Sequence, residues 1–131
     1  CDNTVTAVLQ RDGHVWIKNA YGEPAHAPLR IEKIITLRAG SPVVNVEYSF
    51  CNTGSEEFCA WWASEWNIAL SGAELPERHF HGDDHKAQQN LDEIATFAAV
   101  LNPIVADRWL ELWIEWKFNE PLAMWHVPIH L

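Results

Sequence analysis

The stretch Val43–Phe50, with the sequence VVNVEYSF, is the clearest β-strand in the chain. Its apolar side chains recur at every second position, namely Val44, Val46, Tyr48 and Phe50. A period of two is typical of a strand that buries one side and exposes the other. The turn-forming residues CNTGS follow at positions 51–55. The stretch therefore predicts a half-buried strand that ends in a turn.

Short segments of the same kind continue in both directions along the chain. We expect further strands at Thr4–Gln10, His14–Lys18, Leu29–Arg38, Phe58–Leu70, Trp109–Phe118 and Ala123–Leu131. Arg11–Gly13 has the chemistry of a turn, and residues 19–28 have that of a loop. A helix also fits the tryptophan spacing in Trp109–Phe118, but five alternating apolar positions in a row favour a strand there.

Residues 71–94 form one long connection, which is too long for a simple turn. A short helix within Ala87–Phe97 is the helical candidate that we retain. Many strands, short turns and little helix are typical of sandwiches and barrels. We therefore expect an all-β, antiparallel β-sandwich, as a single domain over residues 1–131.

The charge balance narrows the range of partners. Lys and Arg number 9 against 18 Asp and Glu, which gives a formal net charge of −9. This balance repels phosphate backbones and anionic lipid, so we expect neither nucleic acid nor a membrane as a partner. No apolar run reaches the roughly 18 residues that a membrane helix needs.

The ends and the cysteines suggest a context for the chain. It begins at Cys1 and stops at Leu131 directly after an apolar run, so we expect an excised domain of a larger enzyme. Cys51 and Cys59 flank a loop that contains glycine. We expect free thiols in the cytoplasm, while a bridge across a hairpin is the alternative.

The segment WWASEWN at positions 61–67 carries the best candidate for ligand binding. On a strand, Trp61, Glu65 and Asn67 share one side. An indole stacks on the C–H face of a sugar, and carboxylate and amide groups bond its hydroxyls, so the combination suits carbohydrate. From these residues alone the favoured interpretation is that Trp62 and Trp66 fill the core, while Glu65 and Asn67 lie on a solvated face or pair within the sheet.

A run of histidines gives a second candidate, a metal site. His79, His81, Asp83 and His85 lie within seven residues. Alternation would bring His79 and His81 to one side, where Asp83 or His85 would complete a metal site. No standard zinc spacing is matched, so a solvated polar loop is the favoured interpretation, and we expect no metal and no other cofactor.

Glu65 with His79 or His81 is a third candidate, an acid–base pair. Opening a sugar hemiacetal requires a base and a nearby acid, as in aldose mutarotases and sugar epimerases. No phosphate-binding glycine loop, dinucleotide fingerprint or nucleophile elbow is present in the sequence.

Several short segments in a fixed order carry a resemblance to a known family. They are Val8–Gly13, Ile31–Leu37, Val46–Phe50, Glu65–Leu70, Val105–Trp109 and Trp125–Ile129. Their order resembles the C-terminal domain of glycoside hydrolase family 57 α-amylases and 4-α-glucanotransferases. The most specific pieces are the Glu-x-Asn-x-x-Leu pattern at 65–70 and Trp-x-x-Pro-Ile at 125–129.

The resemblance implies a sandwich like that of galactose mutarotase. It also implies that the catalytic carboxylates lie on a separate barrel-like domain, so no catalytic residue is expected here. Glu65 and Asn67 are the positions that the family pattern carries over to sugar contact. The expected function is a non-catalytic domain that supports the catalytic domain, its partner, and binds α-glucan or oligosaccharide.

Two other functions remain open. One is an aldose mutarotase or epimerase-like enzyme. The other is a purely structural interaction domain, in which Trp109 and Trp113 form a docking face that lets the isolated chain self-associate.

Overall fold

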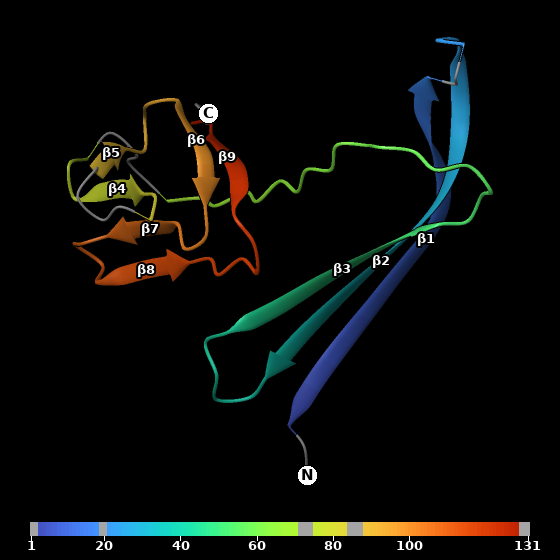
Figure 1. The fold of residues 1–131 in the computed structure, drawn as a ribbon. Coiled ribbons are helices and arrows are strands. Elements are labelled where there is room, and N and C mark those ends of the chain that lie inside the picture. The colour runs from blue at the N-terminus through green and yellow to red at the C-terminus, as the bar shows by residue number, and fades with distance from the viewer. Residues whose placement is uncertain (1–2, 19–20, 71–74, 84–87, 129–131) are drawn as a thin grey trace. The chain divides into compact units, whose positions relative to one another are not determined.

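The computed structural model describes residues 3–18, 21–70, 75–83 and 88–128. Every regular element in this part of the chain is a β-strand, and all strand pairs are antiparallel (Figure 1). The all-β, antiparallel fold class is thus confirmed. None of the described residues belongs to a helix long and apolar enough to cross a membrane. The chain divides into two compact units, Cys1–Glu65 and Trp66–Leu131.

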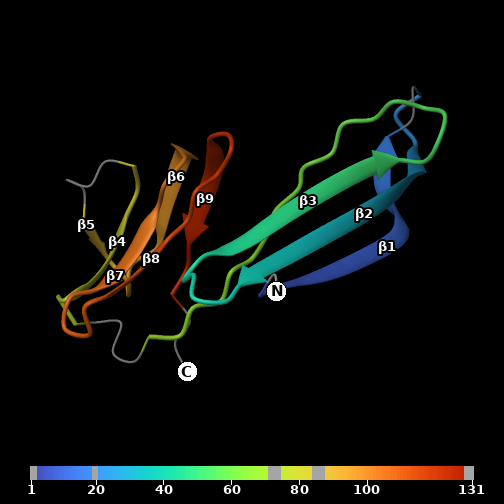
Figure 2. The same cartoon turned by 90° about the horizontal axis from the view of Figure 1, so that it is seen from below.

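The first unit contains a three-stranded sheet with the order β1-β2-β3 (Figure 2). Its strands are β1 (Thr4–Lys18), β2 (Pro24–Arg38) and β3 (Val44–Asn52). β1 and β2 pair without a break from Thr4 opposite Arg38 to Lys18 opposite Pro24. β3 covers only part of β2, from Leu37 opposite Val44 to Leu29 opposite Asn52. The hairpin therefore extends beyond β3 as a two-stranded ribbon.

This register sorts the side chains of the sheet into an apolar and a polar face. The apolar face consists of Val5, Ala7, Leu9, Ile31, Ile35, Leu37, Val44, Val46, Tyr48 and Phe50, with Arg11 and Lys33 among them. The polar face carries Thr6, Gln10, Asp12, Arg30, Glu32, Thr36, Asn45, Glu47 and Ser49, with Val8 and Ile34 among them. Residues directly opposite each other on paired strands share a face, so the period of two in each strand produces this separation.

The chain that follows β3 covers part of the apolar face. The Trp62 ring lies 4.7 Å from that of Tyr48 and 5.3 Å from that of Phe50. The Tyr48 and Ser64 hydroxyls are hydrogen-bonded at 3.1 Å. Two aromatic contacts and one polar contact thus hold the end of this segment on β3.

The second unit contains two sheets that enclose a small core. The larger sheet has the order β5-β4-β7-β8, and the smaller one pairs β6 with β9. The strands are β4 (Arg78–His81), β5 (Gln88–Asn90), β6 (Ala95–Val100), β7 (Ile104–Asp107), β8 (Leu112–Glu115) and β9 (Leu122–His126). Phe80 of the larger sheet is fully buried, and Phe97 and Met124 of the smaller sheet pack against its cluster. This face-to-face packing is that of a β-sandwich.

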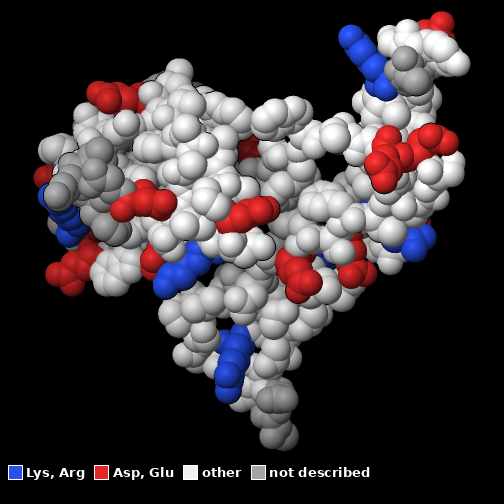
Figure 3. All heavy atoms as spheres, viewed as in Figure 1, with Lys and Arg blue, Asp and Glu red and all other residues white. Residues whose placement is uncertain are grey.

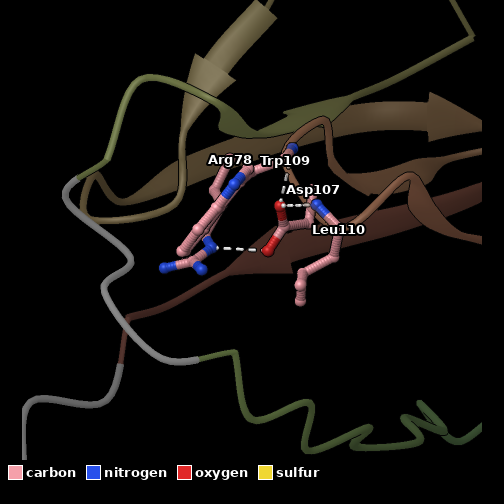
Figure 4. Close-up of polar contacts among 4 residues, drawn as sticks. All are labelled: Arg78, Asp107, Trp109 and Leu110. Carbon is pink, nitrogen blue, oxygen red and sulfur yellow. Dashed lines mark hydrogen bonds and ion pairs between the residues drawn. The ribbon is translucent and has the colours of Figure 1, made fainter.

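A buried ion pair joins two strands of the larger sheet (Figure 4). Arg78 Nε donates to Asp107 Oδ2 at 2.6 Å, and both side chains are almost completely buried. Asp107 Oδ1 accepts the backbone N–H groups of Trp109 and Leu110, each at 3.0 Å. The hydrogen bond from Arg78 first, and that from Leu110 second, lower the pKa of Asp107. One carboxylate therefore fixes both a strand pair and the turn that follows it.

The prediction of a turn at Arg11–Gly13 is wrong. β1 continues through these residues because each has a partner on β2, and Asp12 Oδ1 accepts from Arg30 Nε at 2.7 Å. The turn lies later in the chain, where Gly22 has a φ of 80°. Residues 24–28, expected in a loop, belong to β2.

The strand expected at Phe58–Leu70 is also absent, since this described segment has no ladder partner. Alternating side chains show only that one side of a segment differs from the other. An extended segment that lies on the face of a sheet has two such sides without being a strand of that sheet. The strand expected at Trp109–Phe118 shrinks to β8, because Asp107 holds its first residues in a turn.

The expected helix and long loop are corrected in the same region. Residues 88–90 form β5 and residues 95–97 begin β6, so no helix occupies 88–97; Ala87 lies outside the described residues. The connection 71–94 contains β4 and β5 rather than being one irregular loop. Apolar side chains in this stretch serve strands whose ladders are too short to show a clear period.

Candidate functional site

A tight turn after β3 redirects the chain and sets up the candidate site. Asn52 Oδ1 accepts the Gly54 N–H at 2.9 Å, and Asn52 Nδ2 donates to the Glu56 carbonyl at 2.7 Å. A side chain at position 54 would place its Cβ 2.9 Å from Cγ of Pro28. Glycine is therefore the residue that lets the turn approach β2 this closely.

Past this turn, residues 57–61 line two open hollows on the first unit. The larger hollow, of about 710 Å³, is lined by Ile17, Lys18, Asn52, Glu57, Phe58 and Cys59. The smaller one, of about 370 Å³, is lined by Cys59, Ala60 and Trp61. Because Cys59 lines both, the hollows adjoin, and we call them together the ribbon hollow.

The ribbon hollow combines apolar rings with opposite charges. Trp61 is 98% exposed, so nearly the whole indole is available to a ligand. Phe58 adds a second ring, Lys18 a donor and Glu57 an acceptor. Cys51 and Cys59 are both free, exposed thiols, so the predicted free state holds for these two cysteines.

The two histidines of β4 do not lie in a solvated loop, so that interpretation of the histidine run is wrong for them. His79 and His81 are both buried, with ring centroids 4.4 Å apart and edge to face. Burial first, and the charge of Arg108 second, lower the pKa of His79. The neutral imidazole is therefore the form that the fold favours.

The other two metal candidates add little to these histidines. The Asp83 carboxylate accepts the backbone N–H groups of Leu101 and Asn102, at 2.8 and 2.6 Å. His85 lies outside the described residues. Within the described ranges, no three His, Cys, Asp or Glu side chains gather as a possible metal site.

Comparison with known protein families shows to which family the chain belongs. Residues 2–130 match the family model described as Alpha-amylase/4-alpha-glucanotransferase, C-terminal. The chain belongs to this family. The match spans both compact units, so the suspected resemblance is confirmed at the level of an amylase or glucanotransferase C-terminal domain. No curated protein and no solved structure matches the chain.

In this amylase-type domain, the predicted sugar residues have unequal positions. Trp61 lines the ribbon hollow, whereas Glu65 and Asn67 are exposed and are not among its lining residues. The strand that would align the three on one side is absent. Their joint role in sugar contact, and the pairing of Glu65 with a histidine, stay predictions.

The sequence reasoning missed Lys18, Glu57 and Phe58 as neighbours of the candidate site. Lys18 ends β1, some 40 positions before Glu57, and only the turn at Asn52–Glu56 brings the two to one hollow. The Asn-x-Gly pattern at 52–54 was the available signal, since it predicts a sharp turn.

Proposed function

We propose that this domain is the non-catalytic C-terminal part of a family 57 glycoside hydrolase or glucanotransferase, and that it binds α-glucan at the ribbon hollow. Trp61 carries the proposal, because its 98% exposed indole borders a hollow with polar side chains. In the assembled enzyme the domain supports the catalytic domain and supplies a holding site for the glucan chain.

The chemistry of the hollow fits a neutral polyhydroxy ligand. The indole of Trp61 offers a flat face to the C–H groups of a pyranose ring, and Glu57 and Lys18 offer an acceptor and a donor for hydroxyls. The chain has a formal net charge of −9, and acidic side chains are visible at the surface in Figure 3, which favours an uncharged ligand over an anionic one. Stacking of one ring contributes only about 1 kcal/mol, so we expect weak affinity.

Glu65 and Asn67 belong to the same proposal as an extension of the binding surface. Both are exposed and follow Trp61 within six positions. The family resemblance supports their contact with sugar. A reducing cytoplasm is part of the proposal as well, and the exposed thiols of Cys51 and Cys59 fit it.

Titration calorimetry with maltoheptaose tests the glucan site. We expect weak binding that Trp61→Ala reduces about fivefold or more, since about 1 kcal/mol of stacking is lost. Trp125→Ala is the matched control, because Trp125 is an exposed tryptophan of the other unit. Absence of binding by the unaltered chain, or equal losses in both variants, contradicts the proposal.

A second function has an observation in its favour. Trp109 and Trp113 are 74% and 66% exposed, at and beside the turn between β7 and β8. Exposed indoles of this kind are enriched at protein interfaces. A structural domain that docks its catalytic partner through these tryptophans is therefore the alternative. Loss of co-purification with the separately expressed catalytic domain on Trp113→Ala, with maltoheptaose binding intact, would favour it.

A further inference from the structure

One edge of the first sheet lacks the features that keep strand edges apart. β1 is the outer strand of β1-β2-β3, and no described strand pairs with its other side. Thr4–Gln10, with the sequence TVTAVLQ, contains no charge, proline or glycine, and its pairing with β2 shows no bulge. Natural sheets protect their edges with those devices. β3, at the opposite edge, carries Glu47 in its centre.

The side chains along this edge are apolar and open to solvent. Val5 is 68% exposed, Val8 59% and Leu9 53%. Val5 and Leu9 lie on the apolar face, and Val8 lies on the other. The edge therefore offers unpaired backbone groups between apolar side chains, which is the arrangement that favours addition of another strand.

The sequence of this edge is complementary to itself. When two copies of Thr4–Gln10 lie antiparallel about Ala7, Val5 of each copy faces Leu9 of the other. In the same register Thr6 faces Val8, and Thr4 faces Gln10. A two-fold axis perpendicular to the sheet keeps each face on its own side, so on the apolar face Val5 meets Leu9 and Ala7 meets Ala7.

Charge does not oppose this pairing at the edge, although the chain as a whole carries −9. The nearest described anion on β1 is Asp12, and Arg30 pairs with it at 2.7 Å. Two copies therefore meet along a neutral edge with a compensated carboxylate beside it.

We propose that β1 pairs antiparallel with β1 of a second copy of this chain, centred on Ala7. The two three-stranded sheets then form one continuous sheet, and the two apolar faces become one surface. The contact is isologous, so it closes as a dimer and does not continue into a fibre. This inference is independent of glucan binding at the ribbon hollow.

Light scattering after size-exclusion chromatography, with the 131-residue chain over a range of concentrations, is the first test. We expect a monomer–dimer equilibrium that Ala7→Glu shifts to monomer, because two carboxylates would face each other at the axis. Val46→Glu is the matched control, since Val46 and Ala7 flank Ile35 in one row of the apolar face at opposite edges. The control variant should keep the dimer.

Loss of the dimer in both variants would show association through the apolar face and overturn the proposal, as would a monomeric unaltered chain. Cross-linking covers the case in which Ala7→Glu fails to fold. In a background with Cys1→Ser, Cys51→Ser and Cys59→Ser, Ala7→Cys should form a covalent dimer on mild oxidation, and Val46→Cys should not. Equal yields from both would also overturn it.

Discussion

Asp107 connects a strand pair to the turn that follows it in the second unit. It pairs with Arg78 and accepts two N–H groups of the following turn. The amide of Asp107→Asn keeps the shape but removes the charge beside a buried guanidinium. We expect a clear fall in the melting temperature at neutral pH, measured by circular dichroism.

The pKa of Asp107 also fixes the sign of its pH dependence. Because the fold lowers this pKa below its ordinary value of 3.8, its contribution is fully present at neutral pH. The contribution is lost as the pH falls through the lowered pKa, so the difference in melting temperature between the unaltered chain and Asp107→Asn should become smaller in acid. A difference in melting temperature that stays constant into strong acid would argue against the charge as the cause.

The lowered pKa of His79 leads us to expect a loss of stability at a higher pH than that at which Asp107 titrates. Burial and Arg108 lower its pKa below the ordinary 6.5, so the folded state disfavours the protonated ring. The free energy of unfolding therefore has no penalty from His79 above pH 6.5, and it declines as the pH falls below 6.5. Thermal melts between about pH 8 and pH 5 should show this decline, and His79→Gln should flatten it. An unchanged slope in the variant would exclude His79 as the titrating group.

At the scale of elements, the turn after β3 decides whether residues 57–61 reach the end of the ribbon. Gly54→Ala brings a methyl group to 2.9 Å from Pro28 Cγ, so the turn must shift. We expect a loss of about 1–3 kcal/mol in the free energy of unfolding and weaker maltoheptaose binding. Urea denaturation and calorimetry measure the two effects.

Gly13→Ala provides the control for that turn. A Cβ at position 13 meets no atom within 4 Å, and the residue is in a strand where alanine is accommodated. Stability and binding should stay close to those of the unaltered chain. If both glycine variants behave alike, the close approach to Pro28 is not the reason for glycine at position 54.

Elements also show where the pattern of the sequence was sufficient. The pattern of Val43–Phe50 predicts a strand, and β3 spans Val44–Asn52, because its period of two separates one apolar side from one polar side. Phe58–Leu70 has an equally regular pattern but no ladder. Periodicity shows which side of a segment is apolar. A strand also requires a neighbouring strand whose backbone groups form hydrogen bonds with its own.

At the scale of the whole molecule, the charge of −9 gives a test of the ligand class. A neutral glucan has no charge for salt to screen, so its affinity should change less than about twofold between low and high ionic strength. Calorimetry at two salt concentrations measures this. A steep salt dependence would indicate a charged ligand instead of a glucan.

The sequence by itself determined the all-β class, the family and Trp61 as a residue of the candidate site. These three features follow from local periodicity and short motifs, which are visible in the sequence without knowledge of the tertiary structure. Only the tertiary structure decided that β1 runs through Arg11–Gly13, that His79 is buried, and that Lys18 and Glu57 line one hollow. Those features depend on partners distant in sequence, and the free energy of burial and pairing there outweighs local turn preference.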